Sequence, residues 1–440
     1  MSSLPPGPRS QLWSLFRYLR DPIGCMVPMA RAYGERFTLP GKPPIVCVGD
    51  PAGIRAIYTA DPDLFEPLNK DMGALIGDRS LLLMGGAEHR RARKLMMPPF
   101  HGARMRAYGE PIVRLSEHHS TDWRPGQRVR MLDVLQHISL DVILQAVFGV
   151  TEPARMTALA GTLLELIASL SPLLAVFPGL RHEFGGVGPW ARFSRRRRRL
   201  RVQLDEVIAA ARAAGPREDI LSLLLAARGE DGEPMTDDEL RDQLLVLVLA
   251  GHETTAIAIA WALEALHRPE QAACLERLRA ELATLAPDAT PEQRAKLPYL
   301  EAVCNETLRR YPLAPAPSPR KLLRPLELGD QVLPAGIGVA AAIGVAHFRE
   351  EVYPEPLRFR PERFLAHSFS PFEFLPYGGG ARRCLGAALA SYEMKLVLAT
   401  ILGRYRLRLA SRRPERAAVR AVNSGPARGV VMIVEARVTA

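Results

Sequence analysis

The sequence predicts a mainly α-helical fold with a smaller β region, and three observations support this prediction. Hydrophobic residues recur with helical periodicity along most of the 440-residue chain. Strand-like runs are confined to residues 44–49, 326–342 and 429–434. Residues 244–251 are apolar on every face of a helix, which is typical of a helix at the centre of a large domain. We therefore expect helices packed around one long central helix.

Length and composition limit the possible architectures. A chain of 440 residues exceeds the size of roughly 250–300 residues at which single cores stop growing, so two lobes or one unusually large domain are expected. The Pro-rich start predicts an extended lead-in over residues 1–20, followed by a single domain over residues 21–440. The lead-in has no apolar core of the kind found in signal peptides or membrane anchors.

The cysteines and the net charge bear on compartment and partners. The five cysteines are scattered and form no Cys-x-x-Cys pair, which argues against zinc ribbons, iron–sulfur clusters and a disulfide framework and favours a reducing, cytoplasmic compartment. The net charge of +11 fits nucleic acid, an anionic surface or an acidic protein. Because no nucleic-acid motif with interleaved aromatic residues is found, an acidic protein partner is favoured.

A run of five arginines at residues 195–199 falls within a predicted helix. Five successive residues point all round a helix, so they cannot form one docking stripe. We interpret the run as a solvated outer helix, with contact to a membrane surface or a partner as the alternative.

The strongest candidate for chemistry is the glycine-rich stretch that ends in Cys384. Residues 378–380 are all glycine, which permits a tight turn and close approach of the backbone to a flat ligand. Cys384 follows just before a predicted helix over residues 387–402, where the helix dipole favours a thiolate. A lone thiolate in such a loop fits an axial ligand of heme iron better than a zinc site, which needs several ligands. A turn with a buried cysteine is the alternative.

The second candidate is the segment 236–267. Thr236 and Glu239 form a capping-box pattern that predicts the start of a helix. Glu253 in the middle of the apolar run would be costly in lipid, so a central helix is favoured over a membrane span. A zinc-protease reading of His252 fails because His-Glu-x-x-His requires a histidine where Ala256 stands.

Two further segments are weak alone. His89 and Arg93 lie four residues apart and share one helix face, which by itself indicates a solvated basic helix. Glu306 and Arg309 form an acid–base pair three apart, a common pattern on helices. Several prolines then force an extended path over residues 311–320. Taken by itself, this segment indicates a Pro-rich surface loop.

Taken in order, these segments resemble the motifs of the cytochromes P-450, the heme-thiolate monooxygenases, of the soluble bacterial type. The family pattern Phe-x-x-Gly-x-x-x-Cys-x-Gly is met by Gly380, Cys384 and Gly386, with Tyr377 in place of the usual Phe. Residues 250–255 resemble the family's Ala/Gly-Gly-x-Asp/Glu-Thr-Thr motif, and residues 361–364 resemble its Pro-Glu-Arg-Phe motif.

The resemblance implies the cytochrome P-450 fold, with heme b (iron protoporphyrin IX) between the long central helix and the helix that follows the cysteine loop. It implies that Cys384 is the iron ligand and that Glu253 and Thr254 are the proton-delivering catalytic pair. It further implies a buried structural network of Glu306, Arg309 and Arg363 behind the heme. The other cofactor-binding residues that it implies are His89, Arg93, Arg320, Arg382, Tyr377, Gly378, Gly386, Ala250 and Gly251.

The resemblance also implies an activity. We expect hydroxylation or epoxidation of an apolar small molecule (a terpenoid, steroid-like, fatty-acyl or polyketide compound) with dioxygen and two electrons from a separate donor. The donor would be a ferredoxin or flavodoxin served by an NAD(P)H-dependent reductase, because no dinucleotide motif or spare length exists for a fused reductase. We expect a monomer that binds no nucleic acid and has no membrane anchor. The expected substrate pocket consists of Met72, Leu75, Ile76, Leu82, Val246, Leu247, Ala250, Leu313, Ala314 and Ala316.

Two alternatives keep the fold. One is a peroxygenase or heme-thiolate isomerase, which the intact pair of Glu253 and Thr254 argues against. The other is a non-enzymatic heme carrier or sensor, which turnover of any substrate with a surrogate redox system would exclude.

Overall fold

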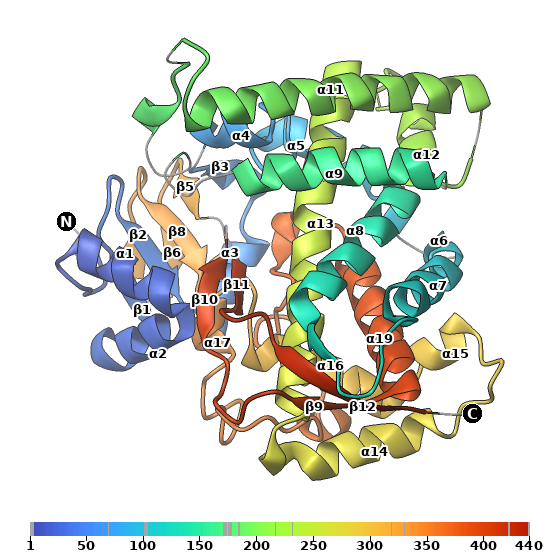
Figure 1. Ribbon diagram of the computed structural model, residues 1–440. Helices are drawn as coiled ribbons and strands as arrows, with labels where there is room; N and C mark the ends of the chain where they lie inside the picture. Colours follow the sequence, from blue (N-terminus) through green and yellow to red (C-terminus); the bar gives the residue numbers. More distant parts are fainter. Residues whose placement is uncertain are drawn as a thin grey trace. The chain divides into compact units, whose positions relative to one another are not determined.

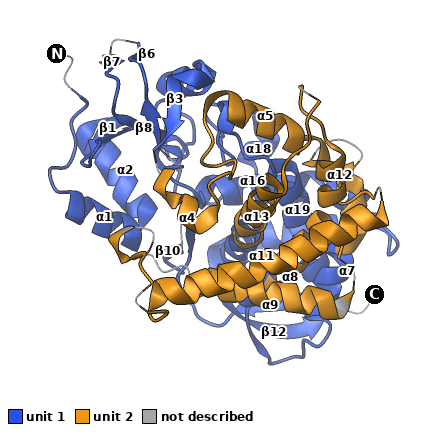
Figure 2. Cartoon of the chain, turned by 90° about the horizontal axis from the view of Figure 1, so that it is seen from above, with its two compact units in different colours: residues 1–68, 112–136, 254–440 blue, residues 69–111, 137–253 orange. Residues whose placement is uncertain are grey.

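The computed structural model describes residues 4–68, 70–100, 104–150, 152–169, 174, 178–183, 185–215, 217–230, 232–317, 319–329, 331–420 and 423–438. Internal contacts divide the chain into two compact units (Figure 2), where the sequence predicts a single domain over residues 21–440. Unit 1 consists of residues 1–68, 112–136 and 254–440, and unit 2 of residues 69–111 and 137–253. The division falls inside three helices: α7 (Gly109–Ser120), α8 (Met131–Phe148) and α13 (Asp237–Leu266).

Every strand in the described part of the chain belongs to unit 1. The largest sheet has the strand order β1-β2-β8-β5-β3, in which β2 and β8 pair in parallel and the other neighbours are antiparallel (Figure 1). β-branched and aromatic side chains such as Val46, Val339 and Phe65 fill a core beneath it, as expected for strands. The bounds are Arg36–Leu39 for β1, Ile45–Val48 for β2, Phe65–Pro67 for β3, Arg320–Leu322 for β5 and Gly338–Ala341 for β8.

Three smaller sheets complete the β region. One has the order β4-β12-β9, one is the pair β10-β11 and one is the hairpin β6-β7. The predicted strand-like runs 44–49, 326–342 and 429–434 therefore coincide with real strands, and the mainly α fold with a smaller β region is confirmed. The bounds are Arg128–Arg130 for β4, Leu326–Leu328 for β6, Gln331–Leu333 for β7, Tyr405–Leu409 for β9, Ala417–Arg420 for β10, Asn423–Pro426 for β11 and Val431–Arg437 for β12.

Some helices of unit 1 contact its sheets, and the others pack against one another. Glu264 and Trp261 on α13 are buried, and the Trp261 ring stacks on Tyr311 at 4.4 Å between ring centroids. Besides its shares of α7, α8 and α13, the unit contains α1 (Gln11–Arg20), α2 (Pro22–Tyr33), α3 (Pro51–Thr59), α14 (Ala272–Leu282), α15 (Pro291–Ala295), α16 (Pro298–Arg310), α17 (Ile343–Ala346), α18 (Arg363–Ala366) and α19 (Ala387–Arg404).

The predicted extended lead-in over residues 1–20 is wrong in its second half. Gln11–Arg20 form helix α1, and Ser10 caps it by accepting a hydrogen bond from the backbone N–H of Trp13 at 3.3 Å. The prolines that enforce an extended path stop at Pro8, so nothing prevents a helix from starting at the next capping residue.

The described residues of unit 2 form helices joined by loops, and none of them belongs to a strand. The predicted capping box is present at the start of α13, because Glu239 N–H donates to Thr236 Oγ1 at 3.2 Å and Thr236 N–H donates to Glu239 Oε2 at 2.8 Å. Besides its shares of α7, α8 and α13, the unit contains α4 (Gly73–Ile76), α5 (Gly86–Met96), α6 (Arg104–Ala107), α9 (Pro153–Ser169), α11 (Pro189–Ala214) and α12 (Ile220–Ala226).

Among the described residues, two helices are long and apolar enough to cross a membrane, Met131–Phe148 and Asp237–Leu266. Two thirds (67%) of the most apolar window of each is buried within the chain, as in helices that form a protein core. Neither is a clear membrane anchor.

Candidate functional site

The glycine loop before Cys384 is held against helix α3 of the same unit. Gly378 and Gly380 have φ angles of +66° and +60°. This is the left-handed region of backbone conformation, which residues with a side chain rarely adopt. A Cβ atom on Gly379 would lie 2.4 Å from the ring of Tyr58, and one on Gly380 would lie 2.5 Å from its carbonyl oxygen. The backbone N–H of Cys384 donates to the carbonyl of Tyr377 at 2.9 Å, which closes the loop. Glycines are therefore required both for the turn and for close packing.

Exposure distinguishes Cys384 from the other cysteines, all five of which lie in the described part of the chain. Cys25, Cys47 and Cys304 are buried and Cys274 is half-buried, whereas Cys384 is exposed. Burial raises the pKa of Cys47 and of Cys304 to about 12, so those thiols stay protonated. Cys384 stands two residues before Gly386, the N-cap of α19. It is the cysteine best placed to act as a thiolate ligand.

The hydroxyl of Tyr377 has a hydrogen-bond partner that was not predicted from the sequence. Its hydroxyl lies 2.7 Å from Oγ of Ser391 on α19, a normal hydrogen bond. Burial raises the pKa of the Tyr377 hydroxyl, so it stays neutral and ties the loop to the helix. The additional hydroxyl, compared with phenylalanine, thus has a partner.

A groove of about 370 Å³ opens beside this loop, entirely within unit 1. Aromatic rings and glycine backbone make up most of its wall, and Arg383 provides a cation. Its lining includes Tyr58, Asn305, Phe372, Phe374 and Tyr377.

The structure brings Glu306, Arg309 and Arg363 together. Arg309 Nε and Nη2 donate to the two carboxylate oxygens of Glu306 at 2.7 and 2.8 Å, and Arg363 Nε lies 3.1 Å from the same carboxylate. The backbone N–H of Arg360 adds a fourth donor at 2.8 Å. Glu306 and Arg309 are fully buried, and burial lowers the pKa of Arg363 despite the opposing charge of Glu306. The Glu306 carboxylate thus accepts a bidentate pair of hydrogen bonds from Arg309 and further bonds from its other neighbours, which compensates for the burial of these charges.

His347 joins this network to the cysteine loop, and sequence reasoning missed it. Arg309 Nη1 donates to the carbonyl of His347 at 2.8 Å, and the backbone N–H of Leu375 donates to Nε2 of His347 at 3.1 Å. The imidazole also stacks on Phe374, with 5.6 Å between ring centroids. Burial, with a smaller effect of the Arg309 charge, lowers the pKa of His347 to about 3. A lone histidine in an apolar run gives no signal in the sequence that could have revealed this role.

Arg320 on β5 is a cation that contacts an aromatic ring and a backbone carbonyl among the described residues. Its guanidinium lies 4.0 Å from the centroid of the Phe65 ring and its Nη2 lies 3.5 Å from the carbonyl oxygen of Ile57. Burial lowers the pKa of Arg320. Within the described residues no carboxylate pairs with it, whereas its neighbour Lys321 lies 3.1 Å from Glu66. A desolvated cation of this kind fits the carboxylate of a bound group.

The residues expected to form the pocket in unit 1 lie on an extended segment. The carbonyl of Leu313 accepts a hydrogen bond from Ser424 N–H at 2.7 Å, and the carbonyl of Pro315 accepts one from Gly344 N–H at 2.8 Å. The side chains of Leu313, Ala314 and Ala316 remain partly exposed between these two attachments. The segment is therefore fixed along its backbone while its small side chains stay accessible.

Helix α13 carries an accessible stripe in an otherwise buried stretch. Ala250 is exposed and Leu247, Gly251 and Thr254 are partly exposed, at the spacing that lines one helix face. Glu253 is also partly exposed. A Cβ atom on Gly251 would lie 2.6 Å from Ile143 of α8, so glycine is required for that packing.

The other predicted residues of unit 2 differ in exposure. His89 is buried and Arg93 is partly exposed on α5. Leu75 and Val246 are buried, and Met72 and Ile76 are partly exposed. Leu82 is 54% exposed.

Gln243, which the sequence analysis did not single out, fastens the segment before α5 to α13. Its Oε1 accepts from Leu81 N–H at 3.0 Å and its Nε2 donates to the carbonyl of Arg79 at 2.6 Å. This side chain is fully buried, and its bond to Leu81 is shielded from water, whereas its bond to Arg79 is only partly buried.

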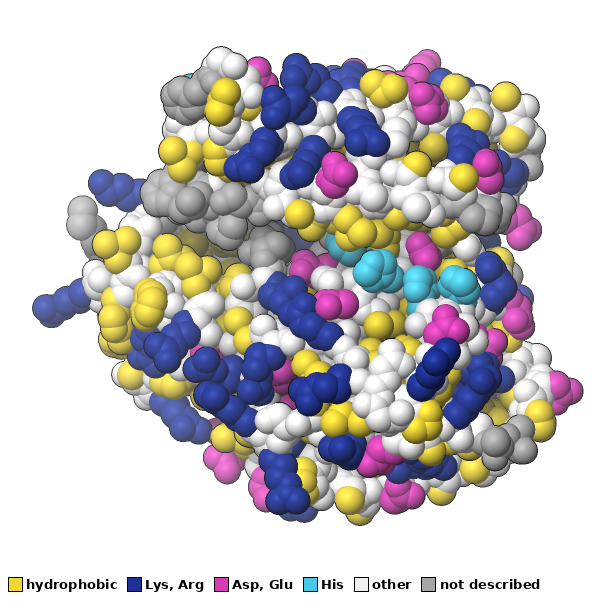
Figure 3. All heavy atoms as spheres, in the orientation of Figure 1, with side chains coloured by type: hydrophobic (Ala, Val, Ile, Leu, Met, Phe, Trp, Pro, Cys, Tyr) yellow, Lys and Arg dark blue, Asp and Glu magenta, His cyan; other side chains and the backbone are white. Residues whose placement is uncertain are grey.

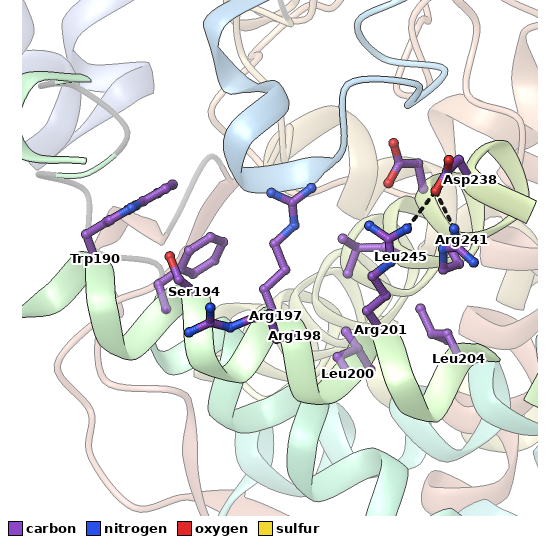
Figure 4. A pocket seen from close by; sticks show the side chains of 12 residues that line it. Trp190, Ser194, Arg197, Arg198, Leu200, Arg201, Leu204, Asp238, Arg241 and Leu245 are labelled. Carbon is purple, nitrogen blue, oxygen red and sulfur yellow. Dashed lines mark hydrogen bonds and ion pairs between the residues drawn. The ribbon is translucent and has the colours of Figure 1, made fainter. Parts of the chain in front are cut away.

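The arginine run lies on α11, beside a groove of about 270 Å³ between α11 and α13 (Figure 4). Arg197 donates to the carbonyl of Ala74 at 2.7 Å, Arg195 donates to that of Gly186 at 2.7 Å, and Arg196 lies 3.7 Å from Glu165. Arg201 pairs with Asp238 across the groove at 2.8 Å. The arginines thus point in several directions and bind different partners, as expected of an outer helix rather than one docking stripe.

Comparison with known proteins establishes the family. The family model described as cytochrome P450 matches residues 4–425. Cytochrome P450 135B1 of Mycobacterium tuberculosis is 35% identical over 98% of this chain and 92% of its own length. Cytochrome P450 135A1 of the same species is 37% identical over 92% of this chain and 89% of its own length.

Solved structures show the same fold. A retinoic acid-bound cyanobacterial CYP120A1 matches with a TM-score of 0.85 and 25% identity over the full length (100%) of both chains. The heme domain of cytochrome P450DA matches with a TM-score of 0.82 over 99% of this chain and 98% of its own. This chain therefore belongs to the cytochrome P450 family, a family of heme-thiolate iron monooxygenases.

Proposed function

We propose that this cytochrome P450 hydroxylates or epoxidises an apolar small molecule, with heme b as its cofactor and Cys384 as the iron ligand. When bound, the heme supplies activation of dioxygen, of which one atom enters the substrate and the other leaves as water with two electrons and two protons. The observation that carries the assignment is the exposed thiol of Cys384 at the end of a glycine loop, in a chain whose other thiols are buried or half-buried.

Four basic side chains are proposed to hold the carboxylates of the cofactor: His89, Arg93, Arg320 and Arg382. The support is strongest for Arg320, because it is desolvated and pairs with no carboxylate in the described part of the chain. A bound carboxylate would supply the missing partner through a charge-assisted hydrogen bond. Tyr377, Gly378 and Gly386 are proposed to line the cofactor from the loop, and Ala250 and Gly251 from α13.

Glu253 and Thr254 are proposed to manage protons. Both are partly exposed in the middle of α13, beside the accessible stripe that Ala250 and Gly251 belong to. A threonine hydroxyl can both accept and donate a hydrogen bond, and a carboxylate can exchange protons with water. The pair can therefore hold a proton near the reacting oxygen and replace it from solvent.

The substrate is proposed to be a terpenoid, steroid-like, fatty-acyl or polyketide compound. The expected pocket residues, including Leu313, Ala316 and Leu247, offer apolar surface worth about 25 cal/mol per Å² buried and few directional polar contacts. The small side chains of Ala314 and Ala316 favour a bulky ring system over a thin chain. A spectral titration of the ferric protein against a diverse apolar library tests this. If only charged, hydrophilic compounds shift the Soret band to shorter wavelength, the proposal of an apolar pocket is wrong.

The electrons are proposed to come from a separate acidic ferredoxin or flavodoxin with an NAD(P)H-dependent reductase, in the cytoplasm, to a monomeric enzyme. The support is the net charge of +11 and the exposed Arg383 beside the cysteine loop. Reduction should slow as salt rises past about 0.1 M, where the Debye length is about 10 Å. Arg383→Gln should reduce that salt dependence, and rates that ignore ionic strength would count against electrostatic docking.

The ligand assignment is tested by spectroscopy. The ferrous carbonyl complex should show the strongly red-shifted Soret band of thiolate ligation, and Cys384→Ser should lose it. Cys274→Ser is the matched control, since it removes a half-buried thiol elsewhere and should keep the band. A Cys384→Ser protein that retains the band would show that the assignment is wrong.

A further inference from the structure

Helix α1 presents its apolar side chains to solvent. Leu12 is 80% exposed, Phe16 63% and Leu19 46%. Together with Trp13 and Leu15, they make up five of the fourteen exposed large hydrophobic residues in the described part of the chain. Figure 3 shows hydrophobic side chains gathered on the surface over α1.

The orientation of α1 is the reverse of an ordinary surface helix. Ser14 is buried, and its Oγ donates to the carbonyl of Ser10 at 2.8 Å. Tyr18, one turn later, packs against the core that contains Cys25 and Met26. A surface helix normally turns its apolar stripe inward and its polar residues outward. Here the polar-tipped face is inward and the leucines point out, so the outward stripe needs a partner of its own.

Positive charges outnumber negative ones around this stripe, although the acidic Asp21 follows α1 directly as its C-cap. Residues 1–20 contain Arg9, Arg17 and Arg20 and no acidic residue. The guanidinium of Arg17 lies 4.7 Å from the centroid of the Trp13 ring and also donates to the carbonyl of Gly24 at 3.3 Å, whereas Arg20 is exposed. Tryptophan beside arginine at the edge of an apolar face is typical of helices that lie in a membrane interface, where ring and cation face the headgroups.

The size of the surface argues against a protein occupant. A helix of 10 residues is about 15 Å long and exposes five large apolar side chains, whereas a stable protein interface uses about 20–30 residues a side. A second copy of this chain would carry the same net charge of +11, which opposes its approach. A bilayer needs only one helix and gains from the arginines if its lipids are anionic.

We propose that α1 binds the surface of an anionic lipid bilayer, with Leu12, Phe16 and Leu19 in the acyl boundary and the arginines among the headgroups. The attachment is peripheral and does not span the membrane. It does not depend on the activity proposed above.

The test is co-sedimentation of the full-length, heme-loaded protein with vesicles. Vesicles of equal parts phosphatidylglycerol and phosphatidylcholine should bind the protein at about 0.1 M salt, and vesicles of phosphatidylcholine alone should bind it more weakly. The double variant Leu12→Glu with Phe16→Glu should lower the partition coefficient at least about tenfold. Arg17→Gln with Arg20→Gln should abolish most of the preference for phosphatidylglycerol.

Leu357→Glu is the matched control, because Leu357 is 64% exposed outside α1 and its substitution should leave binding unchanged. An unchanged Soret band and circular dichroism would show that each variant is folded. The proposal is overturned if wild-type protein does not bind anionic vesicles or if the double variant binds as well as wild type. It is equally overturned if sedimentation velocity shows a dimer that Leu12→Glu with Phe16→Glu converts to a monomer, since the occupant would then be a second copy.

Discussion

The backbone N–H of Leu375 donates a hydrogen bond to Nε2 of His347 at 3.1 Å, across 28 residues of sequence. The backbone carbonyl of the same histidine accepts a hydrogen bond from the guanidinium of Arg309. His347 therefore connects the buried ion network around Glu306 to the segment that leads into the cysteine loop. His347 must stay neutral to accept from Leu375, and burial lowers its pKa to about 3, which ensures this.

Stability should therefore fall as the pH is lowered through the range in which only the unfolded chain binds a proton at His347. An unfolded histidine has a pKa of about 6.5, whereas the folded value is about 3. Between these values the unfolded state binds more protons, so the free energy of unfolding decreases on acidification, by at most about 1.4 kcal/mol per pH unit for one histidine. Urea unfolding of wild type and His347→Gln between about pH 7 and 4.5 should show a shallower slope for the variant.

Gln is chosen because its amide oxygen can still accept from Leu375 N–H. His367→Gln is the control for the same substitution at an exposed histidine. Equal slopes for wild type and His347→Gln would mean that His347 protonates in the folded state.

Glu306→Gln should be among the most destabilising single substitutions in unit 1. It leaves the buried charges of Arg309 and Arg363 without their shared carboxylate, which costs about 3–5 kcal/mol. Glu435→Gln makes the same chemical change in an exposed pair with Arg408 and should cost about 1 kcal/mol or less. Denaturant unfolding of the two variants compares them, and a similar small loss in both would contradict the picture of a shielded network.

Tyr377 and Ser391 should behave as a coupled pair. Ser391→Ala leaves the Tyr377 hydroxyl without its partner at 2.7 Å and should cost about 1–3 kcal/mol. Adding Tyr377→Phe removes the unpaired hydroxyl and should recover part of that loss. A double-mutant cycle on the free energy of unfolding measures the coupling. Additive effects would show that the hydrogen bond contributes nothing.

Arg320→Met should separate cofactor retention from the stability of the ligand-free chain. Removing a desolvated cation that pairs with no carboxylate in the described residues should not lower the free energy of unfolding of the ligand-free protein. Transfer of heme to an acceptor protein should become about tenfold faster, because a charge-assisted hydrogen bond is lost.

Lys321→Met is the matched control on the next position of β5, where the lysine pairs with Glu66. It should leave heme retention unchanged. If Arg320→Met retains heme as well as Lys321→Met does, Arg320 does not hold a cofactor carboxylate.

Thr254→Ala should uncouple electron consumption from product formation. Heme and substrate affinity should persist, while more of the reducing equivalents end as peroxide because protons are no longer delivered in order. The measurement is product formed per NAD(P)H consumed in a reconstituted system. Thr400→Ala, at a buried threonine of α19, should keep the wild-type ratio. An unchanged ratio in Thr254→Ala would defeat the proton role.

Features that depend on neighbouring residues were predictable from the sequence. The capping pair Thr236 and Glu239 predicted the start of α13, and the glycines before Cys384 predicted a tight loop ahead of α19. The prolines of residues 311–320 predicted an extended segment. These signals are local, because capping, helical periodicity and φ preferences depend on residues within one or two turns. The order of such segments along the chain was sufficient to predict the family, which the comparisons confirm.

Only the tertiary structure decided which side chains far apart in sequence meet. It placed His347 beside Leu375, gave Tyr377 its partner Ser391, and left Arg320 without a carboxylate among the described residues. It also replaced the predicted extended lead-in with a helix whose apolar face is outward. Amphipathic periodicity shows that a helix has an apolar face, but the direction of that face depends on which other residues the helix packs against.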